Sequence, residues 1–240
     1  MKLISRKKHR GAAAEKTKNI INNDSKFAIV EGYKSARTSL VFSLVAEDNP
    51  CVAVTSWSKG EGKSTATVNL AISFAKMGKR VLLLDTDLRR PNVHNLLKIK
   101  NGAGVSEVIG QFVEFEDAVY RDVVPCLDVL TSGAIPPNPS ELIGSTAFGS
   151  FMNMVKNQYD YVILDTPPVG VVTDTLLLKE HIAGYVMIIR EKVTTHGDIE
   201  KANQAIKLTD SKILGFLKVG CSLQDRKKYK KGSYGYYKYY

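Results

Sequence analysis

The sequence predicts an α/β fold in which a mostly parallel, twisted sheet is flanked by helices. Short apolar runs rich in Val, Ile and Leu recur along the chain. They are continuous rather than alternating, which is typical of strands buried on both faces. Segments with helical spacing separate these runs, and such alternation places parallel strands in one sheet with helices over it. The 240 residues suffice for one large domain but not for a second full one.

The individual elements follow from these patterns. Apolar residues near helical spacing predict a helix over residues 27–45, beginning after Asp24 or Ser25. Two further helices are predicted over residues 64–77, closed by Gly78, and over residues 197–208. The predicted strands are residues 51–55, 80–84, 127–131, 161–164, 185–189 and 213–219.

The composition excludes several classes of protein. Hydrophobic residues make up 44% and charged residues 24%, which is ordinary for a soluble globular protein. No run reaches the roughly 18 apolar residues of a membrane span, and the first ten residues lack the apolar core of a signal peptide. The protein is therefore expected to be cytoplasmic. Cys51, Cys126 and Cys221 are isolated, which argues against a disulfide framework or a zinc site.

The formal net charge of +10 is concentrated near the two ends of the chain. Residues 1–26 are interpreted as a basic flexible segment, residues 27–222 as the folded domain, and residues 223–240 as a flexible tail rich in Lys and Tyr. Basic ends of this kind bind nucleic acid or anionic lipid, or are simply solvated. No RNA-recognition fold accompanies the Lys/Tyr tail, so nucleic-acid binding is not expected.

A glycine-rich loop with a lysine follows the first predicted strand and opens the next helix. Gly60 and Gly62 let backbone N–H groups turn toward phosphate oxygens, and the helix N-terminus favours an anion. Lys63 would neutralise the β- and γ-phosphates, and Ser64 would ligate Mg²⁺. We therefore predict a P-loop that binds ATP and Mg²⁺. Its predicted nucleotide-binding residues are Lys59, Gly60, Glu61, Gly62, Lys63, Ser64 and Thr65.

Three acidic residues stand at the ends of two predicted strands. Asp85 and Asp87 follow strand 80–84, and Asp165 follows strand 161–164. Ligands of an open parallel sheet bind at the carboxyl ends of its strands, so the three carboxylates should converge on the P-loop. A magnesium ion there needs oxygen ligands, directly or through water. The predicted metal ligands are Ser64, Asp87 and Asp165.

These segments together resemble a known family. Residues 60–64, 85–91 and 165–168 read GEGKS, DTDLRRP and DTPP. They resemble the bacterial protein-tyrosine kinases of capsule and exopolysaccharide synthesis, of the CpsD/CapB type, which are similar to the cytoplasmic part of Wzc. LTSG at residues 130–133, PPNPSEL at 136–142 and the terminal tyrosine cluster extend the resemblance over nearly the whole chain.

The resemblance implies a P-loop NTPase architecture related to MinD and ParA. It also implies an ATP-dependent tyrosine autokinase that regulates capsular or exopolysaccharide synthesis. Its chemistry rests on positioning and charge neutralisation. Lys63 would hold the γ-phosphate, and Asp85, with Asp87 as second choice, would orient the phenol and accept its proton.

The tail offers the acceptors for such a reaction. The candidate phosphoacceptors are Tyr229, Tyr234, Tyr236, Tyr237, Tyr239 and Tyr240. Gly, Ser and Lys between the tyrosines prevent a stable core. Tyrosines on a tether reach a neighbouring active site at high effective concentration, which favours phosphorylation in trans.

A further segment predicts self-association. Glu31, Lys34 and Arg37 share one helix face and resemble the family's oligomerisation element, with Lys34 replacing an arginine. From spacing alone, an ordinary intrahelical ion pair is equally compatible. The resemblance implies a homo-oligomeric ring and a transmembrane activator of the polysaccharide co-polymerase type. That partner would recruit the protein to the inner face of the cell membrane.

The alternative interpretation is an ATPase switch like MinD or ParA, whose hydrolysis controls partner binding. Those proteins carry a lysine five residues before the P-loop lysine, where this chain has Ser58 and, one place on, Lys59. Trp57 also stands where the usual P-loop pattern has its first glycine. The DTDLRRP segment and the tyrosine tail favour the kinase.

Overall fold

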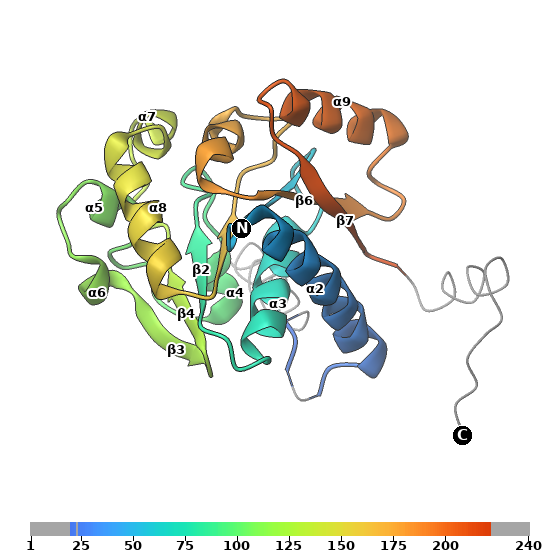
Figure 1. The fold of residues 1–240 in the computed structure, drawn as a ribbon, viewed down its shortest axis with the longest axis horizontal. Helices are drawn as coiled ribbons and strands as arrows, with labels where there is room; N and C mark the ends of the chain where they lie inside the picture. Colours follow the sequence, from blue (N-terminus) through green and yellow to red (C-terminus); the bar gives the residue numbers. More distant parts are fainter. Residues whose placement is uncertain (1–19, 23, 222–240) are drawn as a thin grey trace, which may run out of the picture.

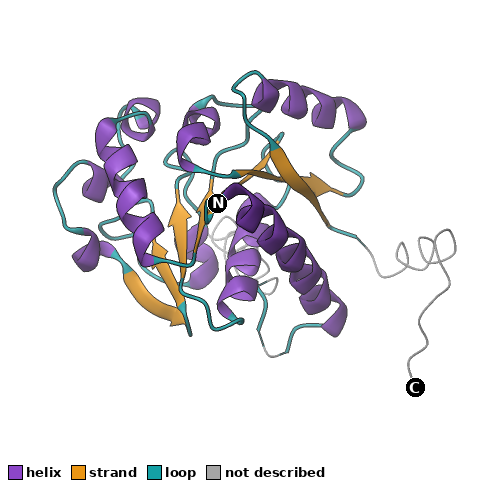
Figure 2. Cartoon of the chain, in the orientation of Figure 1, coloured by secondary structure: helices purple, strands orange, loops and turns teal. Residues whose placement is uncertain are grey.

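The structure, a computed structural model, describes residues 20–22 and 24–221. Strands and helices alternate along the chain as expected, and Figures 1 and 2 show the sheet between layers of helices. The elements in chain order are α2 (Phe27–Glu47), β1 (Cys51–Ser56), α3 (Lys63–Ala75), β2 (Val81–Asp85), α4 (Val93–Leu97), α5 (Val105–Ile109), α6 (Phe115–Ala118), β3 (Tyr120–Val124), β4 (Leu127–Leu130), α7 (Pro139–Ile143), α8 (Thr146–Gln158), β5 (Tyr161–Asp165), the 3₁₀ helix η1 (Asp174–His181), β6 (Gly184–Arg190), α9 (His196–Lys207) and β7 (Ile213–Val219).

Seven strands form one sheet in the order β3-β4-β2-β5-β1-β6-β7. All neighbouring strands in it run parallel except the edge pair of β3 and β4, which is antiparallel. The prediction of a mostly parallel α/β sheet is confirmed. The four central strands bury nearly every residue, because helices cover both faces.

Successive residues of a strand pack into two separate hydrophobic cores, one on each face of the sheet. In β1, Val52 and Val54 pack with side chains of α2, α3 and α4 on one face. Cys51 and Ala53 pack with those of α5, α8, η1 and α9 on the other. The pleat of a strand sends alternate side chains to opposite faces, which explains this division. Helices α2 and α3 lie side by side on the first face (Figure 1).

The sequence analysis missed seven of these elements: strand β3, the helices α4, α5, α6, α7 and α8, and the 3₁₀ helix η1. Strand β3 has exposed Arg121 and Asp122 at its centre, so its composition suggests a loop. Helix α8 buries Phe148, Met152 and Val155, and this i, i+4, i+7 spacing was a readable signal. For the elements that were predicted, the observed boundaries differ from the predicted ones by at most two residues. Helix α3, for example, begins at Lys63 and ends at Ala75.

The parallel register decides where the strand-end residues meet. Asp85 at the end of β2 pairs with Asp165 at the end of β5, and Val54 of β1 pairs with the same Asp165. The P-loop leaves β1 two residues later, after Ser56. The fold therefore brings together three chain segments that are far apart in sequence, at the carboxyl ends of the central strands.

Candidate nucleotide site

The phosphate loop has the backbone that its glycines were expected to allow. Gly60 has φ +82° and Gly62 has φ +90°, in the left-handed region that favours glycine. Helix α3 begins directly after Gly62, so the backbone N–H groups of its first turn lack partners within the helix. This end of α3 is suited to an anion.

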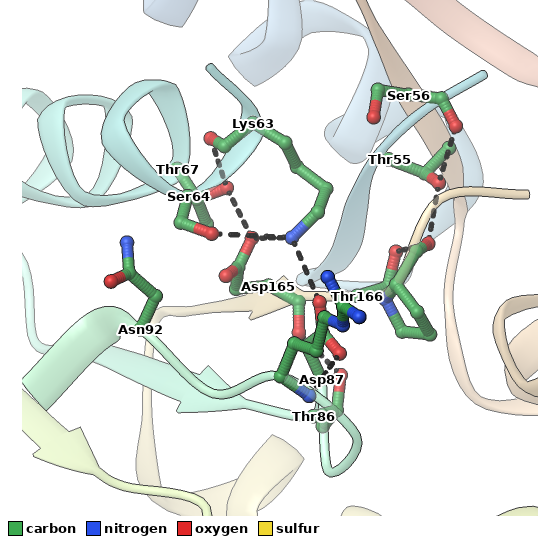
Figure 3. A network of polar contacts seen from close by, with 12 residues as sticks. Thr55, Ser56, Lys63, Ser64, Thr67, Thr86, Asp87, Asn92, Asp165 and Thr166 are labelled. Atoms are coloured by element: carbon green, nitrogen blue, oxygen red, sulfur yellow. Dashed lines mark hydrogen bonds and ion pairs between the residues drawn. The ribbon is translucent and has the colours of Figure 1, made fainter. Parts of the chain in front are cut away.

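Lys63 lies at the centre of a buried polar cluster (Figure 3). Its Nζ is 2.8 Å from Oδ1 of Asp165 and 3.6 Å from Oδ2 of Asp87. The hydroxyl of Thr67 donates to the same Asp165 oxygen at 3.0 Å. Burial opposes the Lys63 charge, but the carboxylates of Asp165, Asp87 and Asp85 outweigh it and raise the pKa of Lys63. The ammonium is therefore charged at neutral pH.

The structure brings the three predicted carboxylates together, but in different surroundings. Asp85 is fully buried, and its Oδ2 accepts N–H groups of Asn92 and Val93 at 3.1 and 3.0 Å. Burial, reinforced by the charge of Asp165, raises the pKa of Asp85 to about 8. Burial also raises the pKa of Asp87, against the opposing effect of Lys63.

A cavity of about 800 Å³ lies against this cluster. Of the predicted site residues, those lining it are Lys59, Gly60, Gly62, Lys63, Ser64, Thr65 and Asp87. Glu61, Asp85 and Asp165 are not among its lining residues. Asp87 is therefore the carboxylate of the DTDLRRP segment that reaches the cavity, whereas Asp85 supports the start of α4.

Three arginines line the same cavity and were not predicted as site residues. Arg89 and Arg90 follow Asp87, and Arg190 ends β6. Arg89 and Arg90 belong to the DTDLRRP segment, so their position in the sequence could have predicted that they line the site. Arg190 had no such signal, because only the fold brings the end of β6 next to the P-loop.

Arg89 fixes one wall of the cavity. Its Nε and Nη2 donate to the Asp174 carboxylate at 2.6 and 3.0 Å. The hydroxyl of Ser140 donates to Asp174 at 2.7 Å. Burial opposes ionisation, but the hydrogen bonds from Arg89 and Ser140 prevail and lower the pKa of Asp174. The PPNPSEL segment is thereby tied to the DTDLRRP segment.

The residues present fit Mg²⁺ bound largely by water and phosphate. No group of three or more His, Cys, Asp or Glu side chains with metal-binding geometry occurs among residues 20–22 and 24–221. Magnesium usually keeps several waters and takes one or two carboxylates plus substrate phosphates. Ser64 and Asp87 on the cavity wall supply such ligands. The second oxygen of Asp165 is buried without a hydrogen-bond partner among the described residues, so it is available to a water of the metal.

Comparisons with known proteins identify a family for the whole chain. A family described as an AAA domain matches residues 50–213. The tyrosine-protein kinase YwqD of Bacillus subtilis is 38% identical over 96% of this chain and 95% of its own length. The putative tyrosine-protein kinase CapB of Staphylococcus aureus is 31% identical over 81% of this chain and 86% of its own.

The chain belongs to this family of bacterial tyrosine-protein kinases.

Solved structures support the same family. The chimerical protein CapA2B2 superposes on this kinase with a TM-score of 0.77 at 34% identity, over 82% of this chain and 86% of that one. MinD of Pyrococcus horikoshii superposes with a TM-score of 0.59 at 22% identity, over 70% of this chain and 69% of its own. The second likeness shows the P-loop NTPase fold alone.

The predicted oligomerisation residues lie on α2 of the kinase but differ in their contacts. Lys34 Nζ forms an ion pair with Glu31 at 2.8 Å, and both side chains are exposed. Arg37 instead donates to the backbone oxygen of Ser73 in the last turn of α3 at 2.7 Å. Arg37 therefore joins two helices of the same chain.

The remaining predictions concern the ends of the kinase and the membrane. The candidate acceptors, Tyr229 to Tyr240, and the basic residues 1–19 lie outside the described residues. Within residues 20–22 and 24–221, no helix is both long and apolar enough to cross a bilayer.

Proposed function

We propose that the chain is an ATP-dependent protein-tyrosine autokinase that phosphorylates its C-terminal tyrosine cluster in trans. One observation carries the proposal. A charged, buried Lys63 lies beside Asp87 and Asp165 on the wall of a cavity that the P-loop also lines. This arrangement supplies both a cation for phosphate and a carboxylate for the acceptor, which transfer to a hydroxyl requires.

Each residue of the site then has a defined task. Backbone N–H groups of the loop and the N-terminus of α3 hold the phosphate chain, and Lys63 neutralises its β- and γ-phosphates. Bound Mg²⁺ supplies further neutralisation of the phosphates. Ser64, Asp87 and Asp165 are the candidates to hold it, directly or through water.

Asp87 is the candidate to orient the acceptor tyrosine. It lines the cavity beside Lys63, so its carboxylate can accept a hydrogen bond and the proton of a phenol there. The phenolic oxygen bonds to the γ-phosphorus as the bond from that phosphorus to the β,γ-bridging oxygen breaks. The phenolic proton passes to the Asp87 carboxylate, and ADP leaves. Asp85, which the sequence favoured for this task, is buried, accepts the N–H groups at the start of α4, and acts through position and charge.

The exposed surface of α2 supports assembly of several copies. Phe27, Phe42 and Val45 are 79%, 74% and 73% exposed, and they lie on the same helix as the Glu31–Lys34 pair. Such apolar exposure on one helix is typical of an interaction surface. We propose that α2 contributes to a ring in which the tail of one subunit enters the site of the next.

The names of the relatives support a proposal about the biological setting. The proposed role is regulation of capsular or exopolysaccharide synthesis, with a transmembrane co-polymerase-type partner as activator. That partner recruits the kinase to the inner face of the membrane.

Incubation with γ-labelled ATP and Mg²⁺ tests the function. Purified full-length protein, with the partner's cytoplasmic tail added, should acquire labelled phosphotyrosine. The second candidate function is the ATPase switch, which Lys59 on the cavity wall favours. Such a switch would release free phosphate and leave the protein unlabelled. Free phosphate without labelled protein would contradict the proposed autokinase activity.

A further inference from the structure

Glu61 occupies an unusual position for a carboxylate in a phosphate loop. Its side chain is only 1% exposed. One carboxylate oxygen accepts the N–H of Ser58 at 2.8 Å, and the other accepts the hydroxyl of Thr194. An exposed acid here would repel phosphate, but these two donors hold Glu61 away from the cavity.

Thr194 connects this carboxylate to the end of β6. Its Oγ1 accepts the N–H of Arg190 at 2.9 Å, and its own N–H donates to the Arg190 oxygen at 3.0 Å. The P-loop and the turn after β6 are therefore one hydrogen-bonded unit. The backbone of Arg190 is fixed relative to Gly60 and Gly62 through two side chains.

The guanidinium of Arg190 extends from this turn over the P-loop. A Cβ added to Gly62 would lie 3.4 Å from its Nη1. The residue lines the same cavity as Lys63, Ser64 and Thr65. Within residues 20–22 and 24–221 no ion pair or side-chain hydrogen bond engages this guanidinium, in contrast to Lys63, whose charge two aspartates balance.

We propose that Arg190 is a second phosphate-binding cation of the nucleotide site, held in place by Glu61 and Thr194. This inference rests on the proposed nucleotide-binding function. The ligand chemistry is the anionic phosphate chain of ATP or ADP, which a planar guanidinium binds through two parallel N–H donors. Glu61 and Thr194 are positioning residues, since neither lines the cavity.

Calorimetric titration with ATP and with ADP tests the role of Arg190. Arg190→Ala should weaken both affinities about 10-fold or more, as expected for loss of a charge-assisted hydrogen bond. Arg190→Lys should weaken both affinities less than Arg190→Ala does, because lysine keeps the charge but lacks the two parallel N–H donors of the guanidinium. Wild-type affinity should also fall more steeply with added salt than that of Arg190→Ala. The matched control is Lys201→Ala on the exposed surface of α9, which removes the same charge and should bind as wild type.

Thr194 supplies the test of positioning. Thr194→Val should weaken ATP binding by about 3-fold or more, and Thr194→Ser, which keeps the hydroxyl, should restore it. In the Arg190→Ala background, Thr194→Val should cause almost no further loss, because the two residues act as one unit. An equal loss in both backgrounds would overturn the positioning role.

The outcomes separate this inference from the proposed function. Wild-type protein that bound neither ATP nor ADP would contradict the nucleotide function and this inference with it. Wild-type binding together with unchanged affinity in Arg190→Ala would overturn this inference alone. Thermal unfolding of each variant without ligand confirms that it folds, and Arg190→Gln replaces Arg190→Ala if the shorter side chain prevents folding.

Discussion

Lys63 connects the stability of the site to its chemistry. Its ammonium neutralises a cluster containing Asp165, whose carboxylate has no exposure to solvent. Removing one partner of a buried ion pair is costly, because the other is left as an uncompensated charge. The same ammonium is the cation that the phosphates need, so a change at Lys63 has two separable effects.

Lys63→Met should therefore abolish phosphotyrosine formation, lower ATP affinity about 10-fold or more, and destabilise the fold by about 3–5 kcal/mol. Chemical denaturation and ATP titration measure the two effects. Ser64→Ala is the matched control for folding, since it keeps the Lys63–Asp165 pair and removes the candidate Mg²⁺ ligand together with one long hydrogen bond from Lys63 at 3.3 Å. Normal ATP use by Lys63→Met would reject the P-loop assignment.

Asp85 and Asp87 should differ in a direct comparison of turnover. Asp87→Asn removes the proton acceptor on the cavity wall and should reduce transfer about 100-fold or more. Asp85→Asn preserves an acceptor for the N–H groups of Asn92 and Val93, so this variant should reduce the rate of transfer much less than Asp87→Asn does. Equal phosphotransfer in wild type and Asp87→Asn would remove Asp87 from the mechanism.

At the scale of elements, two side-chain contacts link segments that are distant along the chain. Arg37 joins α2 to the last turn of α3, and Asp174 of η1 joins Arg89 to Ser140 of α7. Neither could be read from the sequence, because each depends on side chains distant along the chain. The patterns did predict the elements with strong periodicity or long apolar runs, including α2, α3 and the six parallel strands.

Helix α2 gives a prediction about assembly. Alanine at Glu31, Lys34 and Arg37 together should reduce the assembly mass in light scattering and lower phosphorylation in trans. Arg37→Ala alone should cost about 1 kcal/mol of stability through its lost bond to Ser73, so it is the folding control. A mass identical to wild type in the triple variant would exclude this face as the ring interface.

The Asp174 contact gives a prediction about pH. The folded-state pKa of Asp174 is lowered, so its contribution to stability is present above the unfolded pKa and disappears as the pH falls through the folded one. Asp174→Asn should lose about 1–2 kcal/mol at pH 7, a modest value because Arg89 is exposed. Denaturation series at pH 7 and pH 3 measure the difference. A constant loss across this range would show that charge is not the cause.

At the scale of the whole molecule, the site residues gather where the parallel strands have their carboxyl ends. The sequence predicted this convergence because strand-end aspartates of a parallel sheet meet there. Which aspartate reaches the cavity could not be predicted, since it depends on Asp85 accepting the N–H groups at the N-terminus of α4. Arg190 escaped prediction for a similar reason: the proximity of β6 to the P-loop is a property of strand order.

Mixing two inactive variants tests phosphorylation in trans most directly. One is Lys63→Met, which keeps all tail tyrosines but cannot transfer phosphate. The other replaces Tyr229, Tyr234, Tyr236, Tyr237, Tyr239 and Tyr240 with Phe and keeps the nucleotide site. With γ-labelled ATP and Mg²⁺, neither alone should be labelled, whereas the mixture should carry phosphotyrosine on the Lys63→Met chain, within residues 229–240. An unlabelled mixture, or label placed mainly outside these residues, would contradict the account.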